Sequence, residues 1–401
     1  MFAGCAEHGF LTAPLSSGER GPCRGEIVVS IPEAPDAADA ARPSEAVTSK
    51  EDISEEDTFF QQRPFRPETV DEEHGAEPSL RPRSFDEFVG QKRVTENLLI
   101  AIETAIERGD TLDHVLLSGM PGLGKTTLAG LIARAMKVEM RTTSGPALEH
   151  GRDLLGVLTS LKKGDVLFVD EIHRMTPEAE EYLYSAMEDF MVDIVVDRGA
   201  DARTYTLNIQ PFTLIGATTR EGLLSAPFRS RFQIQEKLEA YADVELASIV
   251  VRSATLLGAE IEDDAALELA RRSRGTPRFA NRFLRRVRDV AQYRCRGNTR
   301  SAGLLAIDRA AVEDGLARLG VDSSGLDRID RRILRILVDN GERPTGVKTL
   351  SVSLGEEART IEEVYEPYLI RRGLLVKTPR GRLATSRGAE IVAALAASEP
   401  N

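Results

Sequence analysis

The chain has 401 residues, of which 41% are apolar, so two or three domains with packed cores are expected. Its formal net charge is −12, but residues 1–79 hold 17 acidic and 6 basic side chains, and the remainder is nearly neutral. The overall acidity is therefore a poor guide to partners. No apolar run comes near the roughly 18 residues of a membrane span, and no basic start precedes an apolar core, so neither a membrane segment nor a secretory signal is predicted.

Three cysteines, Cys5, Cys23 and Cys295, are isolated in the sequence and form no Cys-x-x-Cys pair. They indicate neither a disulfide framework nor a zinc site, and isolated thiols are typical of a reducing compartment. We therefore expect a cytoplasmic protein.

Residues 1–79 form an acidic segment that holds 8 of the 19 prolines and shows no helical or strand periodicity. Low apolar content with net negative charge predicts disorder. The segment is interpreted as a partner-binding arm, as a solvated tail, or as an upstream extension from a misplaced start, and we favour the last two. Because no methionine lies between Met1 and Met120, an alternative start would need a non-ATG codon.

Residues 80–240 have the pattern of one large α/β domain. A helix is predicted at residues 92–108, and short apolar strands then alternate with helical stretches. The predicted strands span residues 115–117, 139–143, 166–170 and 213–217. Such alternation is typical of a parallel sheet that is flanked by helices.

Two smaller domains are predicted after the α/β domain. Residues 241–320 indicate helices only, at 244–256, 263–272, 277–293 and 308–319. A linker at Ser323–Gly325 leads into residues 325–395, where helices are predicted at 326–340, 347–354 and 358–372. Short strands at 374–376 and 383–385 then flank a turn at 378–382. Three helices and a terminal hairpin are typical of a winged helix.

The run Gly-Met-Pro-Gly-Leu-Gly-Lys-Thr-Thr, Gly119 to Thr127, fits the pattern Gly-x-x-x-x-Gly-Lys-Ser/Thr and lies between a predicted strand and a predicted helix. Backbone N–H groups of such a loop and the helix dipole point at the same place, which suits a polyphosphate. Lys125 is expected to reach the β- and γ-phosphates of a nucleotide, and Thr126 to offer its hydroxyl to Mg²⁺.

About forty residues later, an apolar strand ends in Asp170 and Glu171. At the carboxyl end of a parallel strand both carboxylates emerge beside the phosphate loop. We expect Asp170 to hold Mg²⁺ through its water shell and Glu171 to accept a proton from the attacking water. Two adjacent acids would be costly inside a core, so the pair indicates nucleotide hydrolysis.

Three further polar residues follow at positions that suit a shared ATP site. Thr219 ends the strand at 213–217 and is preferred over Thr218 as a sensor of the γ-phosphate. Arg231 lies near the end of the α/β domain, where an arginine can act on a neighbouring subunit's phosphate. Arg278 follows a proline at the start of a helix and is expected to reach back to the nucleotide.

The end of the predicted winged helix is basic. Residues 368–387 hold six basic side chains and no acidic one, namely Arg371, Arg372, Lys377, Arg380, Arg382 and Arg387. The preceding helix carries Glu362, Glu363 and Glu366, which would repel phosphate, so that helix is not expected to enter a groove of DNA. We expect the turn at 378–382 to contact the DNA backbone, with Arg372, Lys377, Arg380 and Arg382 as candidate contacts.

In their order, these motifs resemble those of AAA+ ATPases, and in their exact wording they resemble the RuvB family of bacterial Holliday-junction branch-migration motors. The resemblance covers residues 80–387 and rests on the segments LRPRSFDEFVGQ, LDHVLLSGMPGLGKTTLA, GDVLFVDEIHR, YSAMEDF, QPFTLIGATTR, RSRGTPR and YEPYL followed by TPRGR. It implies that Thr219 is sensor 1, Arg231 the arginine finger and Arg278 sensor 2. The implied ATP-binding residues are Leu80, Arg81, Pro82, Gly119, Gly122, Leu123, Gly124, Lys125, Thr126, Thr127, Asp170, Tyr241, Pro277 and Arg278.

The resemblance also implies partners and an assembly. A homohexameric ring would surround duplex DNA, the small helical domain would act as a lid, and the protein would act with RuvA and RuvC in recombination and repair. Two β-rich arms around Arg198-Gly-Ala, within residues 187–211, predict a protruding hairpin. In the family this hairpin grips RuvA. Met120 and Gln233 depart from the family pattern, and neither change removes a phosphate ligand.

Three other classes of protein share part of the pattern. A protein-unfolding AAA+ machine usually carries an aromatic pore loop, whereas residues 143–155 hold no aromatic side chain. A clamp loader lacks a C-terminal winged helix, and a winged-helix regulator without enzymatic activity would not need Glu171. ATPase activity measured with and without duplex DNA separates these alternatives.

Overall fold

A computed structural model describes residues 79–148, 150–195, 204–295 and 304–398. The predicted disordered segment, except for its last residue, lies outside the described residues. None of the described helices is long and apolar enough to cross a membrane.

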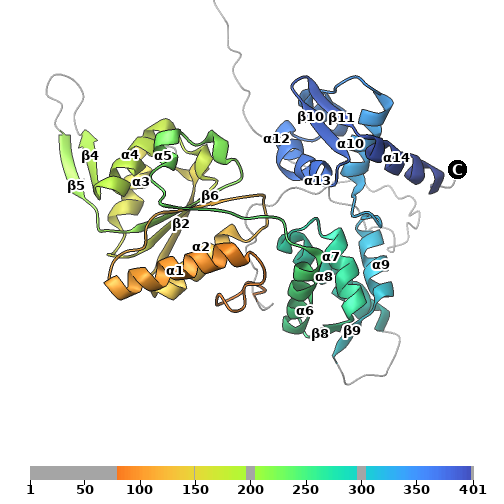
Figure 1. Cartoon of the computed structure of the whole chain (residues 1–401), viewed down its shortest axis with the longest axis horizontal. Coiled ribbons are helices and arrows are strands. Elements are labelled where there is room, and N and C mark those ends of the chain that lie inside the picture. The colour runs from red at the N-terminus through yellow and green to blue at the C-terminus, as the bar shows by residue number, and fades with distance from the viewer. Residues whose placement is uncertain (1–78, 149, 196–203, 296–303, 399–401) are drawn as a thin grey trace, which may run out of the picture. The chain divides into compact units, whose positions relative to one another are not determined.

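A five-stranded parallel sheet, in the order β2-β3-β6-β1-β7, forms the centre of the α/β domain (Figure 1). Its strands are β1 (Val115–Ser118), β2 (Met140–Ser144), β3 (Val166–Asp170), β6 (Thr213–Thr218) and β7 (Ile234–Lys237). The first four confirm the predicted strands to within one residue at each end. The edge strand β7 was not predicted, because Ile-Gln-Glu-Lys holds a single apolar residue.

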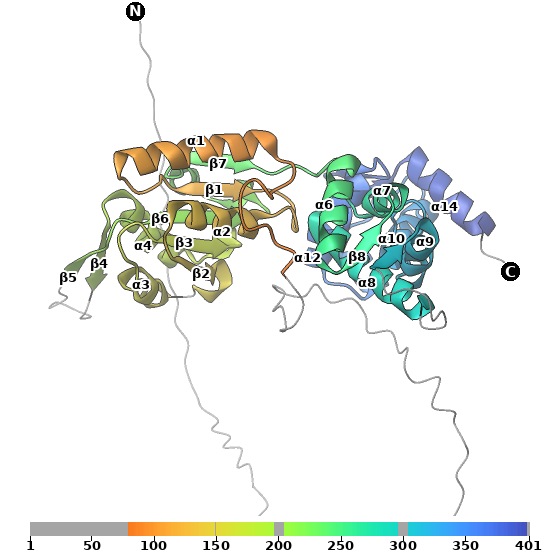
Figure 2. The same cartoon turned by 90° about the horizontal axis from the view of Figure 1, so that it is seen from below.

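Helices cover both faces of this sheet (Figure 2). Alternate side chains of β3 point to opposite faces, so Phe168 packs in one core with α1 and α2, while Leu167 and Val169 pack in another with α3 and α4. The helical elements are α1 (Lys92–Arg108), α2 (Lys125–Met136), η1 (Gly145–Ala147), α3 (Gly151–Thr159), η2 (Ile172–Arg174), α4 (Pro177–Glu188), η3 (Glu221–Leu223) and α5 (Ala226–Arg229). The carboxyl ends of the strands therefore emerge together at one edge of the sheet.

The predicted hairpin is present as β4 (Met191–Val195) and β5 (Thr204–Asn208), which pair antiparallel in the register Met191 to Asn208. Met191, Tyr205 and Leu207 are exposed apolar or aromatic side chains on its arms. The expected turn at Arg198-Gly-Ala lies outside the described residues.

The four helices predicted for the small domain are present in its described residues. They are α6 (Asp243–Leu256), α7 (Asp263–Arg272), α8 (Pro277–Cys295) and α9 (Arg309–Arg318). The expectation of helices only was wrong, because β8 (Ala259–Ile261) and β9 (Leu305–Ile307) form a short parallel pair. Three-residue strands are too short to show a period of two, and their pairing joins segments that are far apart in the sequence.

The C-terminal domain is a winged helix with a modified third helix. Its elements are α10 (Arg328–Asp339), α11 (Val347–Leu354), α12 (Ala358–Thr360), the π-helical segment η4 (Ile361–Tyr365), α13 (Glu366–Arg371), β10 (Leu375–Thr378), β11 (Gly381–Ala384) and α14 (Ser386–Ser398). The predicted helix at 358–372 is thus present as three successive segments, and α14 was not predicted. Tyr365 and Tyr368 are buried in the core of this domain.

Candidate active site

The loop between β1 and α2 has the backbone that only glycine accommodates easily. Gly119, Gly122 and Gly124 have φ angles of 143°, 82° and 106°. A Cβ atom on Gly119 would lie 2.7 Å from the carbonyl oxygen of Leu238. The loop ends at Gly124, and α2 begins at the next residue. Unpaired N–H groups at this helix N-terminus favour binding of an anion.

Lys125 is the cation of this loop. Its side chain is buried, and its Nζ donates hydrogen bonds to the carbonyl oxygens of Gly119 at 2.7 Å and Met120 at 3.0 Å. Burial lowers the pKa of Lys125 to about 8, against the opposing effect of the Asp170 and Glu171 carboxylates. Because the backbone carbonyl of Met120 makes this contact, the unusual side chain at that position leaves it intact.

Asp170 and Glu171 lie where β3 ends, beside the loop. Glu171 has a φ angle of 49°, in the left-handed region that non-glycine residues rarely adopt. Burial, followed by the nearby Asp170 carboxylate, raises the pKa of Glu171. A carboxylate with a raised pKa is a better proton acceptor, as expected of a general base.

Thr219, rather than Thr218, reaches this carboxylate. The Thr219 hydroxyl donates to Glu171 Oε2 at 3.4 Å. Thr218 is fully buried, and its hydroxyl accepts from the Arg220 N–H and shares a hydrogen bond with His173 Nδ1 at 2.9 Å. Burial lowers the pKa of His173 to about 4, so this ring is neutral at pH 7. Sequence patterns gave no signal for His173.

The donor set suits Mg²⁺ that arrives with a nucleotide. Among the described residues, no group of three or more His, Cys, Asp or Glu side chains is arranged to hold a metal ion. The site instead offers the hydroxyl of Thr126 and the carboxylate of Asp170. Mg²⁺ is commonly bound by one or two protein oxygens together with substrate phosphates, so these residues fit the ion.

The residues expected around the adenine come from several segments. Leu80 and Tyr241 are buried, and the Tyr241 hydroxyl donates to the Leu123 carbonyl at 3.2 Å. The Arg278 N–H donates to the Gly122 carbonyl at 3.4 Å, and Pro277 begins α8. Arg81 is exposed.

Two residues that support this region were missed by sequence reasoning. Arg252 holds the Leu80 carbonyl at 3.1 Å and the Glu87 carboxylate at 2.5 Å, and the Phe88 ring lies beside Gly124. Arg252 lies on α6, more than 160 residues from its two partners in the sequence, so no local pattern indicates either contact.

Arg231 lies just after α5, and its described partners belong to α4. Its Nη2 donates to the Tyr184 hydroxyl at 2.6 Å and to Glu188 Oε2 at 2.7 Å. The guanidinium also lies 4.2 Å from the centroid of the Tyr184 ring. The Arg231 guanidinium is therefore held by residues of its own domain.

The basic residues of the wing differ in solvent exposure. Arg380, at the turn between β10 and β11, is exposed. Arg382 is buried and donates to Glu366 at 2.5 Å and to Glu362 at 2.8 Å. The expectation that Arg382 contacts DNA does not agree with this placement, because both carboxylates already satisfy its guanidinium inside the wing.

Lys377 and Arg372 are intermediate cases. Lys377 is half exposed but lies 3.3 Å from Glu362 and 3.4 Å from Glu366. Arg372 follows α13 and is half-buried. Two of the three acidic residues that would have repelled DNA, Glu362 and Glu366, therefore pair with basic residues of the wing.

Arg220, which follows Thr219, links the catalytic edge of the sheet to the winged helix. Its Nη2 lies 3.3 Å from Glu362 and 3.4 Å from Glu363. These residues line a small pocket together with Met120, Pro121, Thr219 and Pro367. Sequence reasoning missed this link, since it joins residues more than 140 positions apart.

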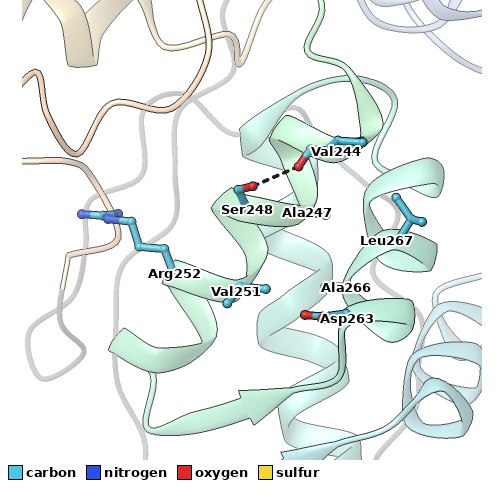
Figure 3. A pocket seen from close by; sticks show the side chains of 8 residues that line it. All are labelled: Val244, Ala247, Ser248, Val251, Arg252, Asp263, Ala266 and Leu267. Carbon is cyan, nitrogen blue, oxygen red and sulfur yellow. Dashed lines mark hydrogen bonds between the residues drawn. The ribbon is translucent and has the colours of Figure 1, made fainter.

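A larger groove lies on the lid between α6 and α7 (Figure 3). Its described lining is mainly apolar, with Val244, Ala247, Val251 and Ala266, and only Arg252 and Asp263 carry charge. Arg252 points away from α7, consistent with its bond to Leu80 (Figure 3). The groove has no set of convergent polar groups and is separate from the phosphate loop.

Comparison with known protein families accounts for nearly all of the described chain. Residues 80–238 match the Holliday junction DNA helicase RuvB P-loop domain, residues 241–322 the RuvB AAA lid domain, and residues 323–393 the RuvB C-terminal winged helix domain. The chain belongs to the RuvB family. This membership confirms the predicted fold of an AAA+ P-loop domain, a lid and a winged helix.

Individual relatives agree with the RuvB assignment. The chain is 53% identical over 316 residues to the Holliday junction branch migration complex subunit RuvB of Salinibacter ruber, covering 79% of this chain and 90% of that protein. It is 55% identical over 312 residues to the RuvB of Myxococcus xanthus, covering 78% and 89%. The solved structure of the Thermotoga maritima RuvB branch-migration motor matches with 47% identity and a TM-score of 0.70, covering 78% of this chain and 98% of that one.

The RuvB assignment also confirms the predicted activity class. The chain is an AAA+ P-loop ATPase of the Holliday-junction branch-migration type, and it binds nucleotide. The structure brings together Lys125, Glu171, Thr219 and the phosphate loop, while Arg231, just after α5, contacts Tyr184 and Glu188 of α4.

Proposed function

We propose that this chain is the ATP-driven motor subunit that moves the branch point of a Holliday junction in recombination and repair. The observation that carries the proposal is the position of Glu171, hydrogen-bonded to Thr219 and close enough to Lys125 for their charges to interact, in a chain that also bears a winged helix. Hydrolysis and duplex binding are the two activities that such a motor combines.

In this proposal the residues around the phosphate loop share the work of hydrolysis. Lys125 contacts the β- and γ-phosphates, Thr126 and Asp170 hold Mg²⁺ partly through water, and Glu171 orients and deprotonates the attacking water. Thr219 and Arg278 report the state of the nucleotide. The metal supplies charge neutralisation on the phosphates when it is bound.

Arg231 is assigned to the neighbouring subunit's ATP. Its partners in its own chain lie on α4, which supports a role outside its own phosphate loop. A homohexameric ring around duplex DNA would place one subunit's finger against the next subunit's γ-phosphate.

Duplex DNA is assigned to the tip of the wing. Arg380 is exposed at the turn, with Lys377 and Arg372 nearby in the sequence, and phosphate contacts of this kind need no base sequence. Arg382 is left out of this DNA surface, and its proposed role is to support the hairpin from inside.

The hairpin in residues 187–211 is assigned to RuvA, and RuvC is assigned to the resolving complex. Met191, Tyr205 and Leu207 present exposed apolar surface on a two-stranded ribbon. An exposed ribbon of this kind favours association with another protein, since free strand edges promote pairing.

The decisive experiment is migration of a synthetic four-way junction by the purified protein with a cognate RuvA, ATP and Mg²⁺. We expect branch migration that stops when Glu171→Gln replaces the native chain. The controls are RuvA alone and a nonhydrolysable ATP analogue. Failure of ring-forming, ATPase-active protein to migrate the junction would contradict the proposal.

A further inference from the structure

Arg274, in the loop between α7 and α8, is a buried charge that the ATPase mechanism does not use. Its side chain is only 3% exposed. Its Nη2 lies 2.6 Å from Asp327 Oδ2 and 2.5 Å from Asp330 Oδ2, both of which belong to the winged-helix domain. Burying an arginine is costly unless carboxylates compensate its charge, so this residue is tied to those two acids.

Both acids are fixed in position by α10. Asp327 caps the helix by accepting from the N–H groups of Ile329 and Asp330, and Asp330 is fully buried. The Arg274 guanidinium also lies 4.9 Å from the Phe279 ring of the lid and 5.1 Å from the Tyr368 ring of the winged helix. Arg274 is thus held between aromatic rings of both domains.

Arginines of the winged helix also donate hydrogen bonds to backbone carbonyls of the lid. Arg371 of α13 donates to the Arg274 carbonyl, and a Cβ atom on the next residue, Gly275, would lie 2.9 Å from the Arg371 guanidinium. Arg331 of α10 donates to the Gly320 carbonyl at 3.1 Å, at the end of the lid. Each of the two domains therefore contributes arginine side chains to the contact between the lid and the winged helix.

The first turn of α8, which directly follows this loop, contacts the phosphate loop. Arg278 donates its N–H to the Gly122 carbonyl, and a Cβ atom on Gly122 would lie 2.8 Å from Arg278 Cβ. Five consecutive residues, 274–278, therefore touch the nucleotide cradle at one end and the winged helix at the other. A displacement of Arg278 has a very short covalent path to Arg274.

We propose that Arg274 is a positioning residue that couples the nucleotide-dependent movement of the lid to the DNA-binding domain. Its pairing with Asp327 and Asp330 makes the lid and the winged helix move together. This inference rests on the proposed motor function. If the contact served only folding, weakening it would leave the amount of branch migration per ATP hydrolysed unchanged.

The test compares Arg274→Gln with Arg272→Gln. Arg272 is a matched control, because it is also buried but pairs with Glu268 inside α7, 2.5 Å away. For Arg274→Gln we expect ATPase activity and duplex affinity within about twofold of the native protein, and branch migration reduced about tenfold. Arg272→Gln is expected to keep the native ratio of migration to ATP hydrolysis.

A distance measurement tests the coupling without any assay of activity. Spin labels are placed on Cys295, which is exposed on α8, and on Val352→Cys, 85% exposed on α11, after Cys5→Ser and Cys23→Ser. We expect a narrow distance distribution in the native background and in Arg272→Gln, and a broad one in Arg274→Gln. If Arg274→Gln is unfolded by circular dichroism, Asp327→Asn, which leaves Asp330 in place, takes its position in both assays.

The outcomes separate this inference from the proposed function. Migration and ATPase activity that fall in parallel, or an unchanged distance distribution, would overturn the role of Arg274. If the native protein itself fails to migrate the junction, the motor function fails, and the spin-label comparison still decides whether Arg274 couples the two domains.

Discussion

Arg231 and Glu188 form an ion pair of 2.7 Å within one subunit, at the end of α4. The guanidinium also stacks on Tyr184. To act on a neighbouring subunit's phosphate, Arg231 must exchange the Glu188 carboxylate for that phosphate. Because Glu188 is half exposed, the pair is worth only about 0.5 kcal/mol, so the exchange is easy.

Replacement of Arg231, the proposed arginine finger, is expected to affect ATP hydrolysis but not ATP binding. Arg231→Ala should bind ATP with unchanged affinity and lose about a thousandfold in ATPase rate, since the transition-state charge lacks its partner. Mixing this variant with Glu171→Gln should restore some turnover at sites that receive Glu171 from one subunit and Arg231 from the other. Absence of rescue in a titration of the two variants would argue against a finger that acts between subunits.

Replacement of Glu188, the ion-pair partner of Arg231, is expected to preserve or raise the ATPase rate, whereas Arg231→Ala lowers it. Glu188→Gln should leave ATPase activity equal to the native value or raise it about twofold, because Arg231 is released from a weak ion pair. Asp189→Asn, at the next position, is the matched control. A large loss of activity in Glu188→Gln alone would mean that Glu188 positions the finger for its work.

The two arginines of the wing are expected to behave differently. Arg380→Ala should weaken duplex binding and reduce the salt dependence of the affinity by about one unit of slope, without loss of stability. Arg382→Ala should lower the free energy of unfolding by about 3 kcal/mol, because it leaves the buried Glu366 with only the longer contact to Lys377. Binding isotherms at several salt concentrations and thermal melts check both. Equal stability of the two variants would contradict the supporting role of Arg382.

The stability of the α/β domain is expected to fall at mildly acid pH through His114. The Leu214 N–H donates to His114 Nδ1 at 2.9 Å, so Nε2 carries the proton and donates to the Met187 carbonyl at 3.1 Å. Burial lowers the pKa of His114 below 6.5. Below about pH 6.5 the unfolded chain therefore binds a proton that the folded chain does not, and the free energy of unfolding falls by up to about 1.4 kcal/mol per pH unit.

Urea unfolding between about pH 7.5 and pH 5.5 measures this effect. His114→Gln should show a shallower dependence on pH, whatever its stability at neutral pH. Identical slopes for the two proteins would show that other groups cause the loss of stability.

The nucleotide site was predictable because its residues lie within motifs whose spacing is set by a strand, a loop and a helix. The pairing of Arg382 with Glu366 was not predictable. The sequence does not distinguish a basic residue that faces solvent from one that binds a carboxylate sixteen positions away. The role of Arg274 escaped for a related reason. Its acids lie more than fifty residues later, and only the folded chain brings them together.

The left-handed backbone at Glu171 sets catalysis against folding at a single position. A glycine would adopt that φ angle without the cost of roughly 1–2 kcal/mol that a side chain incurs there. In the proposed mechanism Glu171 is the general base, so the residue that suits this backbone best is one that would abolish the reaction. A search for thermally hardier versions of this enzyme, scored on stability only, would be drawn toward inactive chains at this position.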